Sequence, residues 1–213
     1  LKDDDYFNLC DYDRFLFAQE LQTPNRWKNL NSFNLDLAKE LEKLHVHKKH
    51  PYDQTLRNGT QTLGSLFANK NYKYKCIFEL KNLFDKAIQK YIKKLNYNDE
   101  HPFLKYIPSS INISGSWSIS LNNGGFHTNH FHSEGWISSV YYVALPDTLD
   151  KKGKSKQGWL KFGEPTHNKY NLLPDKWVQP KVGLLVLFPS YFWHGTEPFQ
   201  SNENRLTVAF DAK

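Results

Sequence analysis

The second half of the chain, from Pro108 onward, consists of short runs rich in β-branched and aromatic residues, separated by Gly, Pro, Asn and Asp. Such a succession is typical of an antiparallel β-sandwich or barrel, because each run can form a strand and each turn residue can reverse the chain. We expect eight strands, over residues 111–121, 126–132, 136–145, 158–162, 176–179, 183–188, 192–197 and 205–211. The jelly roll is the commonest eight-stranded fold of this kind.

The first 107 residues have a helical pattern instead. From Ser32, a candidate N-cap, apolar residues recur at spacings of three and four as far as Leu44, and the same period runs from Ile77 to Leu95. These spacings predict two helices whose apolar faces pack on the rest of the protein. Between them, residues 55–67 are rich in Gly and Thr and are expected to form a loop with short extended pieces.

These patterns predict one domain over residues 1–213, in which a helical or mixed N-terminal part (1–107) packs on a jelly-roll core (108–213). The expected fold class is mainly β with N-terminal helices. Hydrophobic residues make up 39% of the chain and aromatic residues 15%, which excludes the composition of a disordered chain. The lysines behind the formal charge of +6 are spread along the whole sequence, so nucleic acid is not an expected partner. The lysine-rich loop at Lys151–Lys156 is either a solvated hairpin tip or a flap beside a site.

We expect a cytoplasmic protein that does not enter a membrane. No apolar run approaches the roughly 20 residues that span a bilayer, and no charged-then-apolar leader opens the chain. Cys10 and Cys76 show no metal-ligand spacing and cannot form a disulfide framework, so a reducing compartment is the default. Because the chain begins at Leu1 and contains no methionine, we expect the natural start of the protein to lie upstream. Whether a targeting signal precedes Leu1 is left open. The oligomeric state is also open, and a homo-oligomer is compatible with the sequence.

Three histidines lie within six residues in the stretch GGFHTNHFHSEGW. Alternate side chains of a strand point to opposite faces, so we expect His130 and His132 to share one face and His127 to take the other. Two imidazoles about 6.6 Å apart along a strand can lean onto one metal ion. A mononuclear centre then needs a third ligand from another part of the fold. His194 is the candidate, because a jelly roll can bring distant strands to one mouth of the barrel, although taken alone it could be a core histidine.

The motifs from Trp117 to the C-terminus follow a recognisable order. They read W, GGFHTNHFH, VYYVALP, GWLKFGEP, QPKVGLLVLFPSYFWHGTEPF and NRLTVAFD. This order resembles the Fe(II)/2-oxoglutarate-dependent oxygenases, and is closest to an uncharacterised branch whose first metal motif reads H-x-H. The resemblance implies a cupin-like jelly-roll core of the prolyl-hydroxylase type, the double-stranded β-helix.

The resemblance implies that His130 and His194 bind iron, with His132 in the position where better-known members have Asp or Glu. A neutral imidazole there leaves the iron centre one charge unit more positive. The third ligand is therefore either His132 or a carboxylate from elsewhere. Glu134 has the right parity, but along a straight strand it lies about 13 Å from His130, so it could bind only if the chain bends near Gly135.

The resemblance also implies a site for the far carboxylate of 2-oxoglutarate. Arg205 and, two positions later, Thr207 face the same way on the last expected strand, where family members have Arg-x-Ser. A guanidinium can bind a carboxylate through two hydrogen bonds, and a hydroxyl adds a third. Tyr142 aligns with a tyrosine that touches the same carboxylate in several relatives, although it could equally be a core aromatic residue.

The resemblance therefore implies an enzyme that uses Fe(II), 2-oxoglutarate as co-substrate and O2. It would hydroxylate a C–H bond of a peptide, protein or small organic molecule and release succinate and CO2, with His130, His132 and His194 as the catalytic metal ligands. Two alternatives stay open. A three-histidine, cupin-like dioxygenase would not need 2-oxoglutarate, and a non-catalytic jelly roll would hold a structural metal or none. A structural zinc site is normally closed by four ligands, so three histidines favour an open site.

Overall fold

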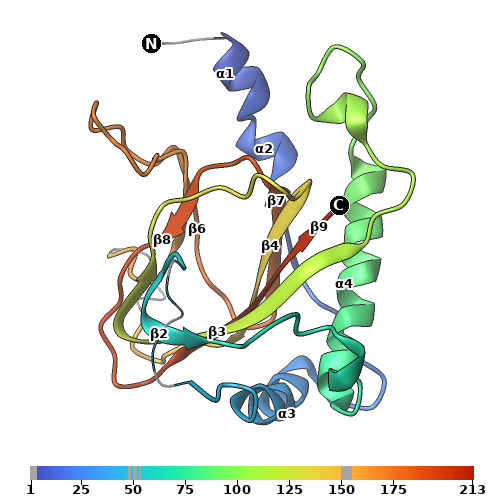
Figure 1. Cartoon of the computed structure of the whole chain (residues 1–213), viewed down its shortest axis with the longest axis vertical. Coiled ribbons are helices and arrows are strands. Elements are labelled where there is room, and N and C mark those ends of the chain that lie inside the picture. Colours follow the sequence, from blue (N-terminus) through green and yellow to red (C-terminus); the bar gives the residue numbers. More distant parts are fainter. Residues whose placement is uncertain (1–3, 48, 50–51, 53, 150–154) are drawn as a thin grey trace.

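The structure, a computed structural model, describes residues 4–47, 49, 52, 54–149 and 155–213, so residues 151–154 of the lysine-rich loop lie outside it. Its strands are β1 (Phe17–Glu20), β2 (Leu56–Gln61), β3 (Ile113–His127), β4 (Ile137–Ala144), β5 (Leu160–Phe162), β6 (Lys176–Val178), β7 (Leu184–Pro189), β8 (His194–Thr196) and β9 (Arg205–Ala212). They form two antiparallel sheets, of order β1-β7-β4-β9-β3-β2 and β6-β5-β8 (Figure 1). The predicted fold class, mainly β with N-terminal helices on a double-stranded β-helix, is confirmed.

One long strand replaces the first two strands that the sequence predicts. β3 continues through the turn-like residues 122–125, and its first part pairs with β9 while its last part pairs with β2. Residues 122–125 lie opposite the single residue Asn58, a bulge that absorbs the glycines without ending the strand. The strand ends at His127, and residues 128–136 follow an irregular path. The expected strand over 126–132 is therefore wrong beyond His127.

The first part of the chain contributes both helices and sheet edges. Its helices are α1 (Asp4–Leu9), α2 (Tyr12–Phe15), α3 (Leu30–Glu42) and α4 (Lys75–Lys94), with short 3-10 turns at Asn69–Asn71 and Leu104–Tyr106. Its strand β2 is one of the expected extended pieces, whereas β1 was not predicted and pairs with β7 at the other edge. None of the helices in the described ranges is long and apolar enough to cross a membrane.

Helix α3 begins earlier than the sequence pattern predicts. Asn29, not Ser32, is its N-cap, and Ser32 is the third residue of the helix. The two side chains form a capping box, in which Ser32 N–H donates to Asn29 Oδ1 at 2.8 Å and Asn29 N–H donates to Ser32 Oγ at 3.3 Å. Serine at the third position is rarer than Glu or Gln, which explains why the pattern placed the cap three residues late.

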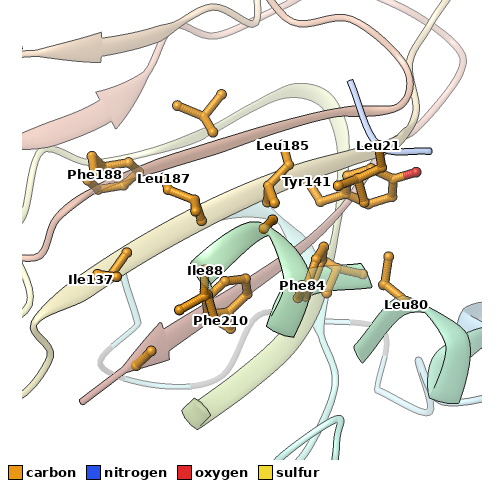
Figure 2. Close-up of a cluster of buried hydrophobic side chains, with 14 of the residues drawn as sticks. Leu21, Leu80, Phe84, Ile88, Ile137, Tyr141, Leu185, Leu187, Phe188 and Phe210 are labelled. Atoms are coloured by element: carbon orange, nitrogen blue, oxygen red, sulfur yellow. The ribbon is translucent and has the colours of Figure 1, made fainter. Parts of the chain in front are cut away.

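Helices α3 and α4 pack against one face of the larger sheet (Figure 1). From α4, Phe84 reaches the rings of Tyr141 on β4 and Phe210 on β9, at centroid distances of 5.7 Å and 4.9 Å (Figure 2). Burying one side chain of this size stabilises the fold by about 1.5–3 kcal/mol. Because this cluster occupies one face of the sheet, the opposite face is left for the cavity between the two sheets.

Strand β9 shows this division along its length. Its even-numbered residues, such as Phe210, pack toward the helices. Its odd-numbered residues line the cavity: Arg205, Thr207, Ala209 and Asp211. A single strand thus presents a cation at one end and an anion at the other to the same interior space.

Candidate metal centre and anion pocket

Three histidines from two distant segments meet in the cavity between the sheets; we call His130, His132 and His194 the histidine trio. An isolated β-bridge joins His130 to His194, with N–H···O distances of 2.9 Å and 2.8 Å in the two directions. His132 N–H donates to the carbonyl oxygen of Ser190 at 2.9 Å. One ring nitrogen from each member lies within 4.8 Å of the others. The structure therefore brings together the three histidines that the sequence nominated as metal ligands.

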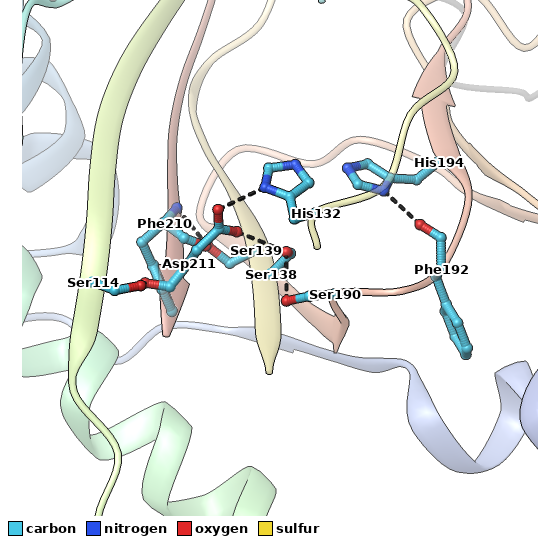
Figure 3. Close-up of polar contacts among 9 residues, drawn as sticks. All are labelled: Ser114, His132, Ser138, Ser139, Ser190, Phe192, His194, Phe210 and Asp211. Atoms are coloured by element: carbon cyan, nitrogen blue, oxygen red, sulfur yellow. Dashed lines mark hydrogen bonds and ion pairs between the residues drawn. The ribbon is translucent and has the colours of Figure 1, made fainter. Parts of the chain in front are cut away.

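The hydrogen bonds of the trio select one tautomer of each ring. The Nδ1 atom of His130 lies 2.8 Å from the backbone carbonyl oxygen of Thr128. The Nδ1 atom of His194 lies 2.8 Å from that of Phe192, and the Nδ1 atom of His132 lies 2.6 Å from Oδ2 of Asp211 (Figure 3). Carbonyl and carboxylate oxygens can only accept, so each Nδ1 carries the hydrogen. Each Nε2 is then left with a free lone pair, the form in which imidazole binds a metal.

Burial keeps His130 and His194 ready to bind a metal. Desolvation, followed by repulsion from His132, lowers the pKa of His130 to about 4. Desolvation and the neighbouring histidines hold the pKa of His194 well below its usual range. Because a protonated imidazole cannot donate a lone pair, these shifts favour the neutral form at neutral pH. The donor set fits a divalent transition metal that keeps open coordination positions.

The second charged feature of the cavity is Arg205, whose side chain is 1% exposed. Within the described residues, its Nε and Nη2 atoms have no hydrogen-bond partner, and neither has the hydroxyl of Tyr142. The guanidinium carbon lies 5.2 Å from the centroid of the Tyr142 ring. A buried cation without an anion is costly, and burial accordingly lowers the pKa of Arg205. These unpaired donors therefore fit an anionic ligand, and Thr207 lies beside them on the same face of β9.

A cavity of about 390 Å³ connects the two features. The trio, Arg205 and Thr207 all line it, and its apolar walls include Ile119, Leu160 and Phe188. Its size is in the usual range for a small-molecule site. A small molecule with an anion at one end could thus reach the trio with the other.

Two sequence-based expectations about this region need correction or comment. His127 does not face away from the trio but lines the same cavity, because the chain leaves the strand after this residue and alternation no longer applies. Burial, followed by repulsion from His130 and Arg205, holds the pKa of His127 well below the usual range. Glu134, the alternative third ligand, is exposed at the edge of the cavity and is not a member of the three-residue group that could hold a metal in the described chain. The geometry thus favours His132 over Glu134.

The sequence did not nominate Asp211, which contacts one of the candidate metal ligands. Asp211 accepts the hydrogen bond from His132 and lines the cavity. The signal was available, because Asp211 has the same parity as Arg205 and Thr207 on the last strand. Its pairing with His132 depends on the irregular segment 128–136 and could not be read from spacing.

Residues 115–211 match the model of a protein family described as "Putative 2OG-Fe(II) oxygenase". No curated protein matches the chain. The match covers the segment from which the sequence resemblance was drawn and confirms it.

Solved structures with the same fold include several oxygenases of this type. A prolyl-4-hydroxylase from Pseudomonas putida is 14% identical, with coverage of 97% of this chain and 98% of that chain and a TM-score of 0.52. The collagen prolyl hydroxylase of Paramecium Bursaria Chlorella virus-1, in its 2OG complex, is 12% identical, with coverage of 96% and 98% and a TM-score of 0.58. A prolyl hydroxylase from Trichoplax adhaerens, in complex with a hypoxia inducible factor peptide fragment, is 12% identical, with coverage of 98% and 88% and a TM-score of 0.59. At these identities the likeness shows the fold.

Proposed function

We propose that the chain is an Fe(II)/2-oxoglutarate-dependent oxygenase, as the family model matched by residues 115–211 indicates, and that it hydroxylates a C–H bond of an organic substrate. The superfamily uses Fe(II), 2-oxoglutarate and O2. The observation that carries the proposal is the presence, in one cavity, of three imidazole nitrogens within 4.8 Å of one another and a buried arginine with unpaired donors. A metal site alone would not require that arginine.

The histidine trio would hold the iron through its three Nε2 atoms. With iron and 2-oxoglutarate bound, the centre would use O2 to oxidise a substrate C–H bond, with release of succinate and CO2. The residues of this chain have to keep the ligands neutral and fixed. The acceptor on each Nδ1 fixes the ring orientation, and burial keeps His130 and His194 unprotonated.

Arg205, Thr207 and Tyr142 would bind the far carboxylate of 2-oxoglutarate. Nε and Nη2 of Arg205 can donate two hydrogen bonds to one carboxylate, and the neutral hydroxyls of Tyr142 and Thr207 can add further donors. Burial raises the pKa of Tyr142, which keeps its hydroxyl protonated. On the same face of β9, Ala209 lies between this end and Asp211, and its small side chain leaves room for the co-substrate.

A peptide or protein side chain is the substrate class that we propose for the open mouth of the cavity. Phe131, 47% exposed, lies at the rim with its ring edge-on to that of Trp193, at a centroid distance of 4.9 Å. Such an aromatic pair offers apolar contact area with little conformational entropy to lose. The Trichoplax enzyme named above, which has the same fold, is bound to a peptide fragment.

The experiment that tests the proposed function is an anaerobic titration of the Fe(II)-loaded protein with 2-oxoglutarate. Chelation of ferrous iron by a 2-oxo acid gives a weak visible charge-transfer band. The parent is compared with His132→Ala and Arg205→Ala, and with Arg26→Ala as a matched control, because Arg26 is exposed. We expect the band in the parent and the control and its loss, at moderate 2-oxoglutarate concentration, in the other two variants.

The other outcomes separate the alternatives. A band that survives in His132→Ala would move the third ligand to Glu134 or leave a two-histidine centre. Absence of the band with iron bound in the parent would favour the three-histidine dioxygenase that does not use 2-oxoglutarate. A metal coordinated entirely by protein groups would refute both enzymatic functions.

A further inference from the structure

The carboxylate of Asp211 has two well-defined partners. Oδ2 lies 2.6 Å from Nδ1 of His132, and Oδ1 accepts a hydrogen bond from Ser138 Oγ at 2.7 Å (Figure 3). Ser138 lies directly opposite Asp211 in the pairing of β4 with β9. The strand register therefore holds this carboxylate in place independently of His132.

A second contact ties His132 to the same group of residues. Ser190 Oγ lies 2.9 Å from Ser138 Oγ, and the carbonyl oxygen of Ser190 accepts the backbone N–H of His132. Both ends of the Asp211–His132 hydrogen bond are thus anchored to the strand ends at Ser138 and Ser190. The ring of His132 has little freedom to turn away from the carboxylate.

The chain passes over this group in a way that only glycine allows. A Cβ atom at Gly135 would lie 2.5 Å from Ser190 Oγ and 3.4 Å from Cβ of Asp211. A contact of 2.5 Å is far inside van der Waals distance, so a side chain there would push Ser190 away. The close approach covers the pair, and the side chains of His132 and Asp211 are only 19% and 17% exposed. At such exposure their interaction is screened much less than that of a surface pair.

We propose that Asp211 is the positioning residue of the metal centre and that it supplies the negative charge missing from the ligands themselves. This inference rests on the proposed function. Asp211 holds His132 in the tautomer with hydrogen on Nδ1 and the lone pair on Nε2. Three neutral imidazoles carry no charge, whereas two histidines and a carboxylate carry one negative charge. The carboxylate of Asp211, hydrogen-bonded to His132, places one negative charge next to the metal site, separated from the metal by the His132 ring.

The first test measures metal affinity with Co(II) alone, by calorimetry and by the visible spectrum of the bound ion. Asp211→Asn keeps the size and one oxygen acceptor but removes the charge. We expect it to bind Co(II) about 10–100-fold more weakly than the parent, the usual cost of removing such a partner. Asp85→Asn, on α4, is the matched control: Asp85 pairs with Lys81 far from the site, and its loss removes the same charge.

The second test reads the His132 tautomer in the metal-free protein by ¹⁵N NMR of labelled histidine, with His132→Gln to assign the signal. We expect the Nδ1–H form in the parent and a mixture of the two tautomers in Asp211→Asn. This readout does not depend on metal, co-substrate or activity, and the parent measurement stands even if the variant is unstable. A predominantly Nε2–H ring in the parent would overturn the inference.

The outcomes separate this inference from the function on which it rests. Equal Co(II) affinity of the parent and Asp211→Asn would refute the role of Asp211 and leave the oxygenase proposal intact. Failure of the parent to bind Co(II) at all would refute both. Thermal unfolding of each variant shows whether a loss of Co(II) affinity reflects a loss of fold. The tautomer measurement on the parent does not depend on the stability of any variant.

Discussion

Replacing Arg205 with methionine tests whether this cavity is built for an anion. Arg205 is 1% exposed, and two of its guanidinium nitrogens have no partner among the described residues. Methionine fills a similar volume and needs no hydrogen bonds. We therefore expect Arg205→Met to be more stable than the parent without 2-oxoglutarate, although it removes a residue central to the proposed function.

The magnitude follows from the unpaired groups. A buried polar group left without a partner costs about 1–3 kcal/mol, so the two nitrogens together cost about 4 kcal/mol. Methionine forfeits the contact of the guanidinium with the Tyr142 ring, worth about 2 kcal/mol when desolvated. The free energy of unfolding should thus rise by about 2 kcal/mol. For a chain of this length the melting temperature should rise by about 4–8 °C.

The assay is thermal and urea unfolding with and without 2-oxoglutarate, in the presence of redox-inert Mn(II). At a ligand concentration of 100 times its Kd, the parent should gain about 2.7 kcal/mol and overtake the variant, which should gain little. The exposed control Arg26→Met should stay within about 0.5 kcal/mol of the parent in both conditions. A ligand-free Arg205→Met that is less stable than the parent would show that the guanidinium is already satisfied, and the anion argument would fail.

Three further predictions follow from the same contacts. The two adjacent tyrosines should have different effects when each is replaced by phenylalanine. Tyr141→Phe should lower the free energy of unfolding by about 1 kcal/mol, because the Tyr141 hydroxyl donates a hydrogen bond to Asn34 Oδ1 on α3 at 2.7 Å, and should leave the 2-oxoglutarate affinity measured by calorimetry unchanged. Tyr142→Phe removes a hydroxyl that has no partner in the described part of the chain, so it should be at least as stable as the parent but bind 2-oxoglutarate about fivefold more weakly. A loss of stability with unchanged affinity would contradict the assignment. Gly135→Ala should destabilise the protein by about 1–3 kcal/mol in urea unfolding, and adding Ser190→Ala should restore part of the loss, since the closest clash is with the Ser190 hydroxyl. Burial lowers the pKa of His45 in the folded state, so the unfolded chain binds more protons and the free energy of unfolding falls as the pH drops below about 6.5. His45→Gln should make this fall shallower by at most about 1.4 kcal/mol per pH unit, measured by urea unfolding at several pH values. An unchanged slope would refute the effect.

Much of the fold was predictable because it depends on local periodicity. Alternation along the last strand correctly placed Arg205 and Thr207 on one face, and the apolar spacing correctly located α4. The strand boundaries were predicted wrongly where turn-forming residues lie within a strand that is paired on both sides. The expected break between two strands at residues 122–125 is instead a bulge, because pairing with β2 and β9 on either side keeps β3 continuous.

The sequence predicted which residues donate to the candidate metal site, but not the contacts that position them. Residue type and order nominated His130, His132 and His194, and the structure brings them together. Strand alternation failed for His127, because the backbone beyond it is held by one isolated bridge to residue 194 and one hydrogen bond to residue 190, and not by a continuous ladder. Periodicity carries no information about such a segment.

The sequence by itself determined which chemical groups this protein can offer: imidazoles in an H-x-H motif, a distal histidine, and an arginine and threonine in step on a terminal strand. Only the tertiary structure decided which of these groups meet. It favoured His132 over the exposed Glu134 as third ligand, brought His127 into the lining of the cavity, and formed the hydrogen bond between His132 and Asp211. The physical reason is that each of these outcomes depends on contacts between residues far apart in the chain, whose distances are set by the packing of two sheets and not by the spacing within one strand.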